Sequence, residues 1–471
     1  MHRKLLLGED EIREAARQLG ELLAGYQSSL PERPVFPTLD RDFIRRILDE
    51  PLPEQGRPLA ELFREFAEEV VPNSTQIAHP RYLAYVLASP HGIAPFADAL
   101  ASALNQGCAL WELSPVANAV EQKVLAWLRG LFGLPEDGAG YLTSGGSMAN
   151  LTGLAAARDW HLGEAARREG LQGARPPMVL YASEEVHTSV DKAAALLGLG
   201  VDSVRRIPVD AQFRMRVDRL EAAVARDREA GRDPFCVVAT AGTVTTGAID
   251  PVASIADLCA REGLWLHVDG AYGALAVLSE RLAPSLREAG LADSLALDPH
   301  KLLFNSLEAG CVLFRDAERA RHCFGFASSY LAKPEDPDLF DFKDYGPELS
   351  RSFKALKVWW ALRAFGRRAY AETIDGLLDL ARHMAARVEA APELELAAPV
   401  TLTAVCFRAR GLDDAGQARL LRSIVESGLA HLGPARVEGR LCLRACMTNL
   451  RTREADVDQV VEALASTARS L

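Results

Sequence analysis

Residues 264–270 read LWLHVDG, an apolar run that ends in an aspartate and a glycine. Alanine-rich stretches with helical periodicity separate it from four similar runs, which are MVLYAS (178–183), PFCVVATAG (234–242), SLALD (294–298) and AGCVLFRD (309–316). Continuous apolar strands that alternate with helices are typical of a mainly parallel sheet with both faces covered. The sequence therefore predicts an α/β fold between about residues 86 and 315.

Polar residues follow these apolar runs at the point where each strand should end. Asp269 closes the opening run, Asp298 to Lys301 follow the run at 294, Thr243 follows the run at 234, and His187 lies just beyond the run at 178. Ligands of parallel sheets bind outside the carboxyl ends of the strands. We expect these side chains to meet at one rim of the sheet.

Composition limits the classes of partner. The 471 residues carry a net charge of -11, with 49% hydrophobic and 25% charged residues. This acidity argues against nucleic acid or an anionic membrane as the main partner, because phosphate binding depends on clustered Lys and Arg. No run is long and apolar enough to span a bilayer, and the N-terminal stretch turns acidic before a signal-peptide core develops. We expect a cytoplasmic protein.

Eight cysteines are scattered without CxxC pairs, which indicates inert core thiols and no metal site.

The chain is expected to divide into three parts. Residues 1–85 hold helical patterns without a core of their own, 86–360 hold the strand and helix alternation, and 361–471 read as a smaller α+β domain. The proline-rich and acidic segment 328–350 is weakly periodic, which is typical of a long loop.

The stretch YLTSGGSMANLTGLAAARDW (141–160) predicts a strand, a Ser/Gly turn and a helix. Glycines let the backbone approach an anion, and the free N–H groups of a helix start favour a phosphate. A simple helix cap by Ser144 or Ser147 would explain the same pattern. The stretch matches neither the P-loop nor the dinucleotide fingerprint.

Asp269 and Lys301 suggest a specific cofactor chemistry. A buried carboxylate requires a cationic or hydrogen-bonding partner, which a pyridinium N–H supplies. A lysine amine near a phosphate site, with an acid for a ring nitrogen, is what pyridoxal phosphate requires. The alternatives are an aspartate that caps a turn and a solvated lysine on a surface turn.

The ordered motifs resemble the group II pyridoxal-phosphate-dependent amino-acid decarboxylases, the aromatic-L-amino-acid decarboxylase-like family. The resemblance covers nearly the whole chain. It rests on HVDGAYGA (267–274) and DPHK (298–301), together with HPRYLAY (79–85), WELSPVANAVEQKVLAWL (111–128), TSGGSMANL (143–151), EEVHTSVDKAA (184–194), ATAGTVTTGAIDP (239–251) and SRSFKALKVWW (350–360).

The resemblance implies a fold of the aspartate-aminotransferase type (fold type I) and a homodimer with active sites at the subunit interface. It implies that Lys301 is the Schiff-base lysine and that Asp269 pairs with the pyridine nitrogen. His187 would stack on the ring, with Ala271 against the other face. The remaining implied cofactor contacts are Gly146 and Ser147 at the phosphate, Thr243 near the ring, and His300 and Asp298 toward the phosphate end.

Tyr330 matches the family tyrosine that assists protonation of the α-carbon after carbon dioxide leaves. Relatives with phenylalanine at this position are aldehyde synthases, so the tyrosine favours simple decarboxylation to an amine. Three alternatives stay open, which are an aldehyde synthase, a decarboxylase of a non-aromatic amino acid, and a silent cofactor-binding homologue.

Departures from the family bear on the site. Asp298 stands where many relatives have asparagine, and Met148 stands where glutamate is frequent. Tyr85 and Trp111 are candidate aromatic walls of the substrate pocket, and Val86 and Ala109 replace phenylalanines common in aromatic decarboxylases. Trp111 fits core packing equally well. Only Arg81 stands out in these segments as a clamp for a side-chain carboxylate, so an acidic substrate is disfavoured.

Overall fold

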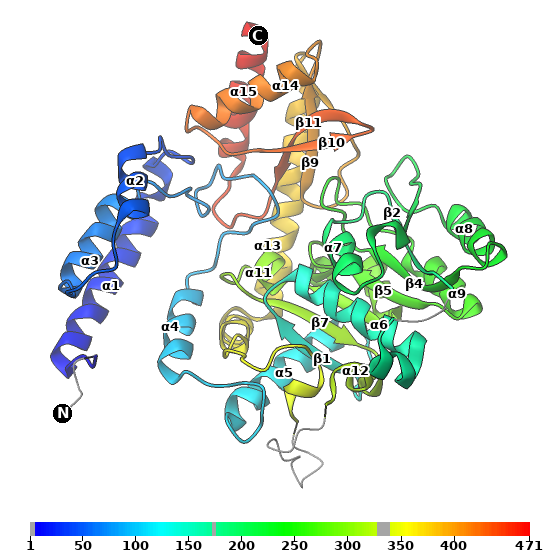
Figure 1. The fold of residues 1–471 in the computed structure, drawn as a ribbon. Helices are drawn as coiled ribbons and strands as arrows, with labels where there is room; N and C mark the ends of the chain where they lie inside the picture. Colours follow the sequence, from blue (N-terminus) through cyan, green and yellow to red (C-terminus); the bar gives the residue numbers. More distant parts are fainter. Residues whose placement is uncertain (1–4, 172–175, 327–339) are drawn as a thin grey trace.

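The central element of the protein is a seven-stranded sheet in the order β1-β7-β6-β5-β4-β2-β3 (Figure 1). The computed structural model describes residues 5–171, 176–326 and 340–471. The strands are β1 Ala139–Thr143, β2 Met178–Ser183, β3 Val204–Ile207, β4 Asp233–Thr240, β5 Trp265–Asp269, β6 Ser294–Leu297 and β7 Gly310–Phe314. Strands β2 to β6 are mutually parallel, and β7 is antiparallel to β6 and β1. The predicted α/β fold is confirmed.

Helices cover both faces of this sheet, which is why its strands are apolar along their whole length. One face carries α6 (Gly146–Glu169), with α7 (Ser189–Leu196) and α12 (Ala317–Phe324) packed beside it. The other face carries α5 (Pro115–Phe132), α8 (Val217–Glu229) and α9 (Val252–Glu262). The short helices α10 (Ala283–Leu286) and α11 (Pro299–Leu302) flank β6 in the chain.

The C-terminal part contains a separate four-stranded antiparallel sheet in the order β10-β11-β9-β8 (Figure 1). Its strands are β8 Leu394–Leu396, β9 Ala404–Ala409, β10 Gly433–Val437 and β11 Arg440–Cys446. Helix α13 (Ala355–Ala390) leads to this sheet, and α14 (Asp414–Glu426) and α15 (Glu454–Ser470) pack near it. Helix α13 is interrupted at Gly366, whose φ of 70° and ψ of 163° are not helical.

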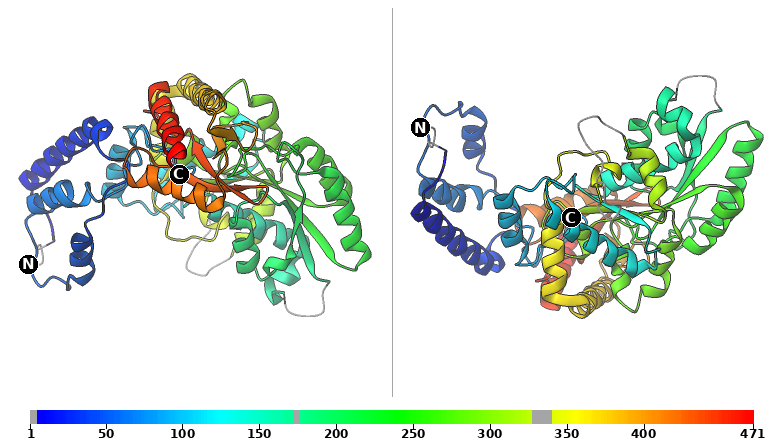
Figure 2. Two further views of the ribbon diagram at one scale, coloured as in Figure 1. Left: turned by 90° about the horizontal axis from the view of Figure 1, so that it is seen from above. Right: turned by 90° about the horizontal axis from the view of Figure 1, so that it is seen from below.

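The N-terminal helices stand apart from this body (Figures 1 and 2). They are α1 (Glu9–Ser29), α2 (Arg41–Asp49) and α3 (Leu59–Glu65), and α4 (Ala94–Leu104) lies between them and the main sheet. Helix α1 has no buried residue, and large apolar side chains stay exposed on this region, among them Ile44, Ile47, Leu48, Leu62 and Phe66.

The predicted three-part division stays a prediction. The two sheets do fall within 86–360 and 361–471. The boundary at 360 lies inside α13, however, and the backbone N–H of Leu83 donates to the carbonyl of His431 at 2.9 Å, so the end of the first part is paired with the third.

Within the described ranges, no helix is both long and apolar enough to cross a bilayer.

Candidate active site

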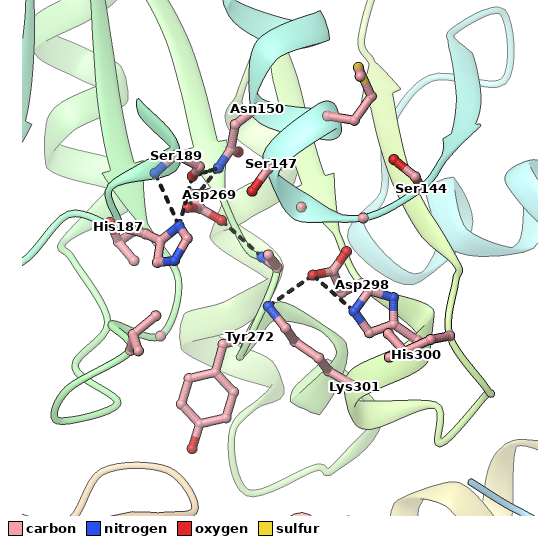
Figure 3. Close-up of a pocket in the computed structure, with 18 residues that line it drawn as sticks. Ser144, Ser147, Asn150, His187, Ser189, Asp269, Tyr272, Asp298, His300 and Lys301 are labelled. Carbon is pink, nitrogen blue, oxygen red and sulfur yellow. Dashed lines mark hydrogen bonds and ion pairs between the residues drawn. The ribbon is translucent and has the colours of Figure 1, made fainter. Parts of the chain in front are cut away.

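A cavity of about 360 Å³ lies at the carboxyl ends of β4, β5 and β6 (Figure 3). It receives side chains or backbone from Asp269, Lys301, His187, Ala271, Gly146, Ser147, His300 and Asp298. The carboxyl ends of parallel strands meet at one edge, and this edge therefore collects the polar groups that follow each strand. The geometry brings together every one of these eight predicted residues.

The start of α6 forms the anion-binding side of the cavity. Gly146 and Ser147 begin the helix, where backbone N–H groups have no acceptor within the helix and the helix dipole favours a negative charge. A Cβ at Gly146 would lie 2.8 Å from the Cβ of Ala271 and 2.9 Å from Oδ2 of Asp298. Only glycine leaves this backbone bare at such close approach.

Lys301 lies in α11, three residues after Asp298, and its Nζ is 2.8 Å from Oδ2 of that aspartate. Asp298 is buried, and its Oδ1 has no partner among the described residues. His300 places Nε2 3.6 Å from Oδ2 of Asp298, and burial lowers the pKa of its imidazole. The lysine amine is thus held at a rim of the cavity and is not free in bulk solvent.

Asp269 ends β5 and is 5% exposed. Its Oδ1 accepts from the backbone N–H of Ala271 at 3.1 Å, and its Oδ2 accepts from Nδ2 of Asn150 at 2.9 Å. A carboxylate has further acceptor positions, so the face toward the cavity can still accept a hydrogen bond.

His187 presents its ring to the open side of the cavity (Figure 3). Its Nδ1 lies 2.8 Å from the hydroxyl of Ser189 and accepts from the backbone N–H of Ser189 at 3.2 Å. Partial burial lowers the pKa of His187, which favours the neutral ring. With Nδ1 as the acceptor, the proton of the neutral ring is on Nε2.

Thr243 does not line this cavity. Its hydroxyl lies 2.9 Å from that of Thr246 and accepts from the N–H of Ala248 at 3.1 Å, so it serves the turn after β4. Thr240 lines the cavity in its place, and its buried Oγ1 has no partner among the described residues. The contact predicted for Thr243 stays a prediction without support from this geometry.

The candidate substrate walls also lie away from this cavity within one chain. Ala109 is buried, and its carbonyl accepts from the N–H of Lys343 at 3.0 Å. Trp111 lines a different hollow beside β1 and α5. Tyr85 is exposed with φ of 57°, and Val86 is partly buried against the core.

Arg81 is engaged elsewhere. Its Nε donates to the carbonyl of Leu429 at 2.8 Å, and its Nη1 lies 3.7 Å from Asp456. Tyr330 lies outside the described residues.

Other residues of the cavity were not anticipated from the sequence. Asn150 and Ser189 contact Asp269 and His187, and Val244, Tyr272 and Leu307 add apolar surface. A signal for Asn150 existed, because Gly146, Asn150 and Gly153 recur at helical spacing and so share one face of α6.

The cavity fits pyridoxal phosphate. The glycine-lined helix start suits a phosphate, the amine of Lys301 suits an aldehyde, and Asp269 suits a ring N–H. Asp298 and Thr240 also line the cavity, and one buried oxygen of each, Asp298 Oδ1 and Thr240 Oγ1, has no partner among the described residues. No cluster suited to a metal ion occurs among the residues searched, those that the structure describes.

Comparison with known proteins agrees with this fit. Residues 42–410 match the family model described as the pyridoxal-dependent decarboxylase conserved domain. The aromatic-L-amino-acid decarboxylase of Bacillus atrophaeus is 34% identical, over 98% of this chain and 96% of its own length. The L-2,4-diaminobutyrate decarboxylase of Rhizobium meliloti is 35% identical, over 91% of this chain and 86% of its own length.

A solved structure gives the same result. The crystal structure of Oryza sativa TDC with PLP and tryptamine superposes with a TM-score of 0.92 at 28% identity, and the match covers 98% of this chain and 99% of that one. The chain therefore belongs to the pyridoxal-dependent decarboxylase family and is a pyridoxal-phosphate-dependent amino-acid decarboxylase.

Proposed function

We propose that this decarboxylase converts an aromatic L-amino acid to its amine and carbon dioxide, with Lys301 as the residue that binds the cofactor aldehyde. The observation that carries the site assignment is the placement of the Lys301 amine and the Asp269 carboxylate on the walls of one cavity whose third wall is a helix start. When bound, the cofactor supplies an electron sink that accepts the electron pair released with carbon dioxide.

The chain's own residues would act on defined atoms. Asp269 would accept the hydrogen bond of the protonated ring nitrogen and so hold that proton in place. The N–H groups of Gly146 and Ser147 would donate to the phosphate. The neutral ring of His187 would cover one face of the heterocycle, with its Nε2 proton directed into the cavity, and Ala271 would leave room on the other face.

The side chains around the cavity favour an aromatic substrate. The apolar surface comes from Met148, Val244, Tyr272 and Leu307. Of the described residues that line the cavity, none is an arginine that could hold a side-chain carboxylate, and Arg81 is bonded to Leu429.

A basic substrate such as 2,4-diaminobutyrate is the second candidate, because the relative from Rhizobium meliloti carries that name at similar identity. A side-chain amine would need a free carboxylate. The two aspartates of the described cavity wall are already engaged in part, since Asp269 accepts from Asn150 and Ala271 and one oxygen of Asp298 pairs with Lys301. This engagement favours the aromatic class.

The active form is proposed to be a homodimer with shared sites. The exposed apolar side chains on α2 and α3 require a cover, and the helices stand away from the rest of the chain (Figure 2). Trp111 and Ala109, which do not line the described cavity of their own chain, would then contribute to the cavity of the partner. We also propose a cytoplasmic location, which the eight buried free cysteines favour.

The test is to incubate the purified holoenzyme with aromatic, basic and acidic L-amino acids and to measure amine, carbon dioxide, aldehyde and hydrogen peroxide together. We expect amine and carbon dioxide in equal amounts from at least one aromatic substrate. Turnover of diaminobutyrate alone would overturn the substrate class. Aldehyde with hydrogen peroxide in place of amine would overturn the reaction outcome and identify an aldehyde synthase.

A further inference from the structure

A directional chain of hydrogen bonds runs behind Asp269 and begins at Trp265. An indole N–H can only donate, so Nε1 of Trp265 donates to Oγ of Ser294 at 2.9 Å. The Ser294 hydroxyl is then free to donate to Nδ1 of His267, at 2.8 Å. Nε2 of His267 lies 2.9 Å from Oδ1 of Asn150, and Nδ2 of Asn150 donates to Asp269 at 2.9 Å.

The direction of this chain determines the state of each member. With Nδ1 of His267 as the acceptor, the proton of the neutral ring is on Nε2, which donates to the amide oxygen of Asn150. His267 is fully buried, and burial lowers its pKa to about 4, so the ring stays neutral. The amide of Asn150 is thereby locked with its NH₂ group toward the carboxylate of Asp269.

Asn150 also connects to the opposite wall of the cavity. Its Nδ2 donates a second hydrogen bond to Oγ of Ser189 at 2.9 Å, and the Ser189 hydroxyl lies 2.8 Å from Nδ1 of His187. One buried amide thus links the proposed partner of the ring nitrogen with the proposed cover of the ring (Figure 3). Rotation of the amide would place its oxygen against the Asp269 carboxylate, which is unfavourable.

A glycine on the same helix face makes room for this chain. Gly153 follows Asn150 by three residues on α6. A Cβ at Gly153 would lie 2.6 Å from Cε1 and 2.7 Å from Nδ1 of His267, and 3.2 Å from Oγ of Ser294. The helix therefore approaches the sheet closely at the one point where the histidine passes between them.

We propose that Asn150, oriented by His267 and Ser294, is a positioning residue that holds Asp269 and His187 in the geometry required by the cofactor ring. This inference rests on the proposed roles of Asp269 and His187. Asn150 acts through these two side chains, and its removal leaves one oxygen of Asp269 without its buried donor. Loss of a hydrogen bond that orients a metal ligand typically costs about 10- to 100-fold in affinity or activity, and we expect a similar cost for the carboxylate that would pair with the ring nitrogen.

The test compares Asn150→Leu with a matched variant, Asn449→Leu. Asn449 is equally buried and donates to the carbonyls of Ile77 and His79, away from the cavity. We expect Asn150→Leu to raise the dissociation constant of pyridoxal phosphate, measured by absorbance titration of the apoprotein, by about 10-fold. We expect kcat to fall by about 10- to 100-fold with little change in KM, whereas Asn449→Leu should retain wild-type values of all three.

A second pair separates positioning from packing. His267→Gln can still donate to Asn150, whereas His267→Phe fills the space without a donor. The inference requires His267→Gln to recover most of the cofactor affinity and kcat that His267→Phe loses. These variants also decide the case if Asn150→Leu does not fold, because equal losses in the two, with wild-type unfolding midpoints, would overturn the inference.

The two levels of the proposal fail in different ways. If wild-type protein forms no borohydride-trapped adduct at Lys301, the proposed function fails. If that adduct forms while Asn150→Leu binds the cofactor and turns over like wild type, only the positioning role of Asn150 is wrong.

Discussion

The two ends of the cofactor cavity are built differently. At the Asp269 end, both carboxylate oxygens accept hydrogen bonds from the protein, and the donor Asn150 is itself fixed on all sides. At the Asp298 end, one oxygen pairs with Lys301 and the other has no partner among the described residues. The Asp269 carboxylate is thus fixed through both oxygens by neutral donors, whereas the Asp298 carboxylate is held through one oxygen by a charged amine.

This difference has a physical reason. A ring nitrogen keeps one protonation state only if its partner is fixed in place, and fixed dipoles in a buried site require no reorganisation when the reaction occurs. A phosphate instead brings its own acceptors and requires donors with space around them. The bare backbone N–H groups at the start of α6 supply such donors at that end of the site.

The largest effect is expected from Asp269→Asn, which breaks the organised end by removing the negative charge opposite the ring nitrogen. We expect kcat to fall by about 10²- to 10³-fold, the typical loss when one preorganised electrostatic group is removed. Steady-state assays of amine formation measure it. Asp293→Asn is the control and should keep full activity. Asp293 lies just before β6, at the end of the strands away from the cavity, and accepts from the N–H of Leu266.

Gly146→Ala tests whether the start of α6 binds the phosphate. The added methyl group would lie 2.8 Å from the Cβ of Ala271, so the helix start must move away from the ligand. We expect cofactor affinity to fall about 10-fold, since close backbone approach is lost. Gly130→Ala on α5, where no atom lies within 4 Å of the new Cβ, should leave affinity unchanged. Equal affinities of the two variants for pyridoxal phosphate would contradict the assignment of the start of α6 as the phosphate site.

Asp298→Asn sharpens the comparison between the two ends of the cavity, because we expect it to have a much smaller effect than Asp269→Asn. The amide keeps the shape of the carboxylate and removes a negative charge beside Gly146 at the start of α6. The substitution also removes the ion pair with Lys301. We expect cofactor affinity to change by about two- to fivefold, toward tighter binding, because a like charge no longer lies near the phosphate site. A fall in kcat as large as that of Asp269→Asn would show that the two ends are equally organised and would refute the contrast.

A further effect, on stability and not on activity, concerns pH. The pKa of His267 is about 4 in the folded protein and about 6.5 when unfolded, so between these values only the unfolded chain takes up the proton. The contribution of the neutral His267 ring to folding stability is complete above pH 6.5 and is lost as the pH falls toward 4. Denaturant titrations measure the free energy of unfolding at pH 7 and at pH 5. Between these two pH values, wild type should lose about 2 kcal/mol more of this free energy than His267→Gln loses. Identical losses would mean that this ring is not buried in the neutral form.

Sequence reasoning captured most of the fold and most of the residues that gather at the carboxyl ends of the strands. The run at 178–183 coincides with β2, and LWLHVDG places Asp269 at the end of β5. Apolar runs and strand ends depend on local pattern, so they can be read without coordinates.

The details that the sequence does not specify lie where the chain turns or meets distant residues. Thr240 faces the cavity because it ends β4 in register with Asp269, whereas Thr243 lies in a turn that closes through the N–H of Gly247 to its carbonyl at 2.9 Å. The contact between Asn150 and Asp269 joins residues far apart in the chain, and no local pattern specifies it. In the proposed homodimer, the placement of Trp111 relative to a substrate would depend on a second subunit, which one sequence does not position.

The measurement that tests the central claim most directly is borohydride reduction of the holoenzyme followed by peptide mapping. The account predicts one stoichiometric cofactor adduct on Lys301, which is absent in Lys301→Arg, a variant that retains the positive charge beside Asp298. A stoichiometric adduct on another lysine, or no adduct in protein that forms amine from its substrate, would contradict it.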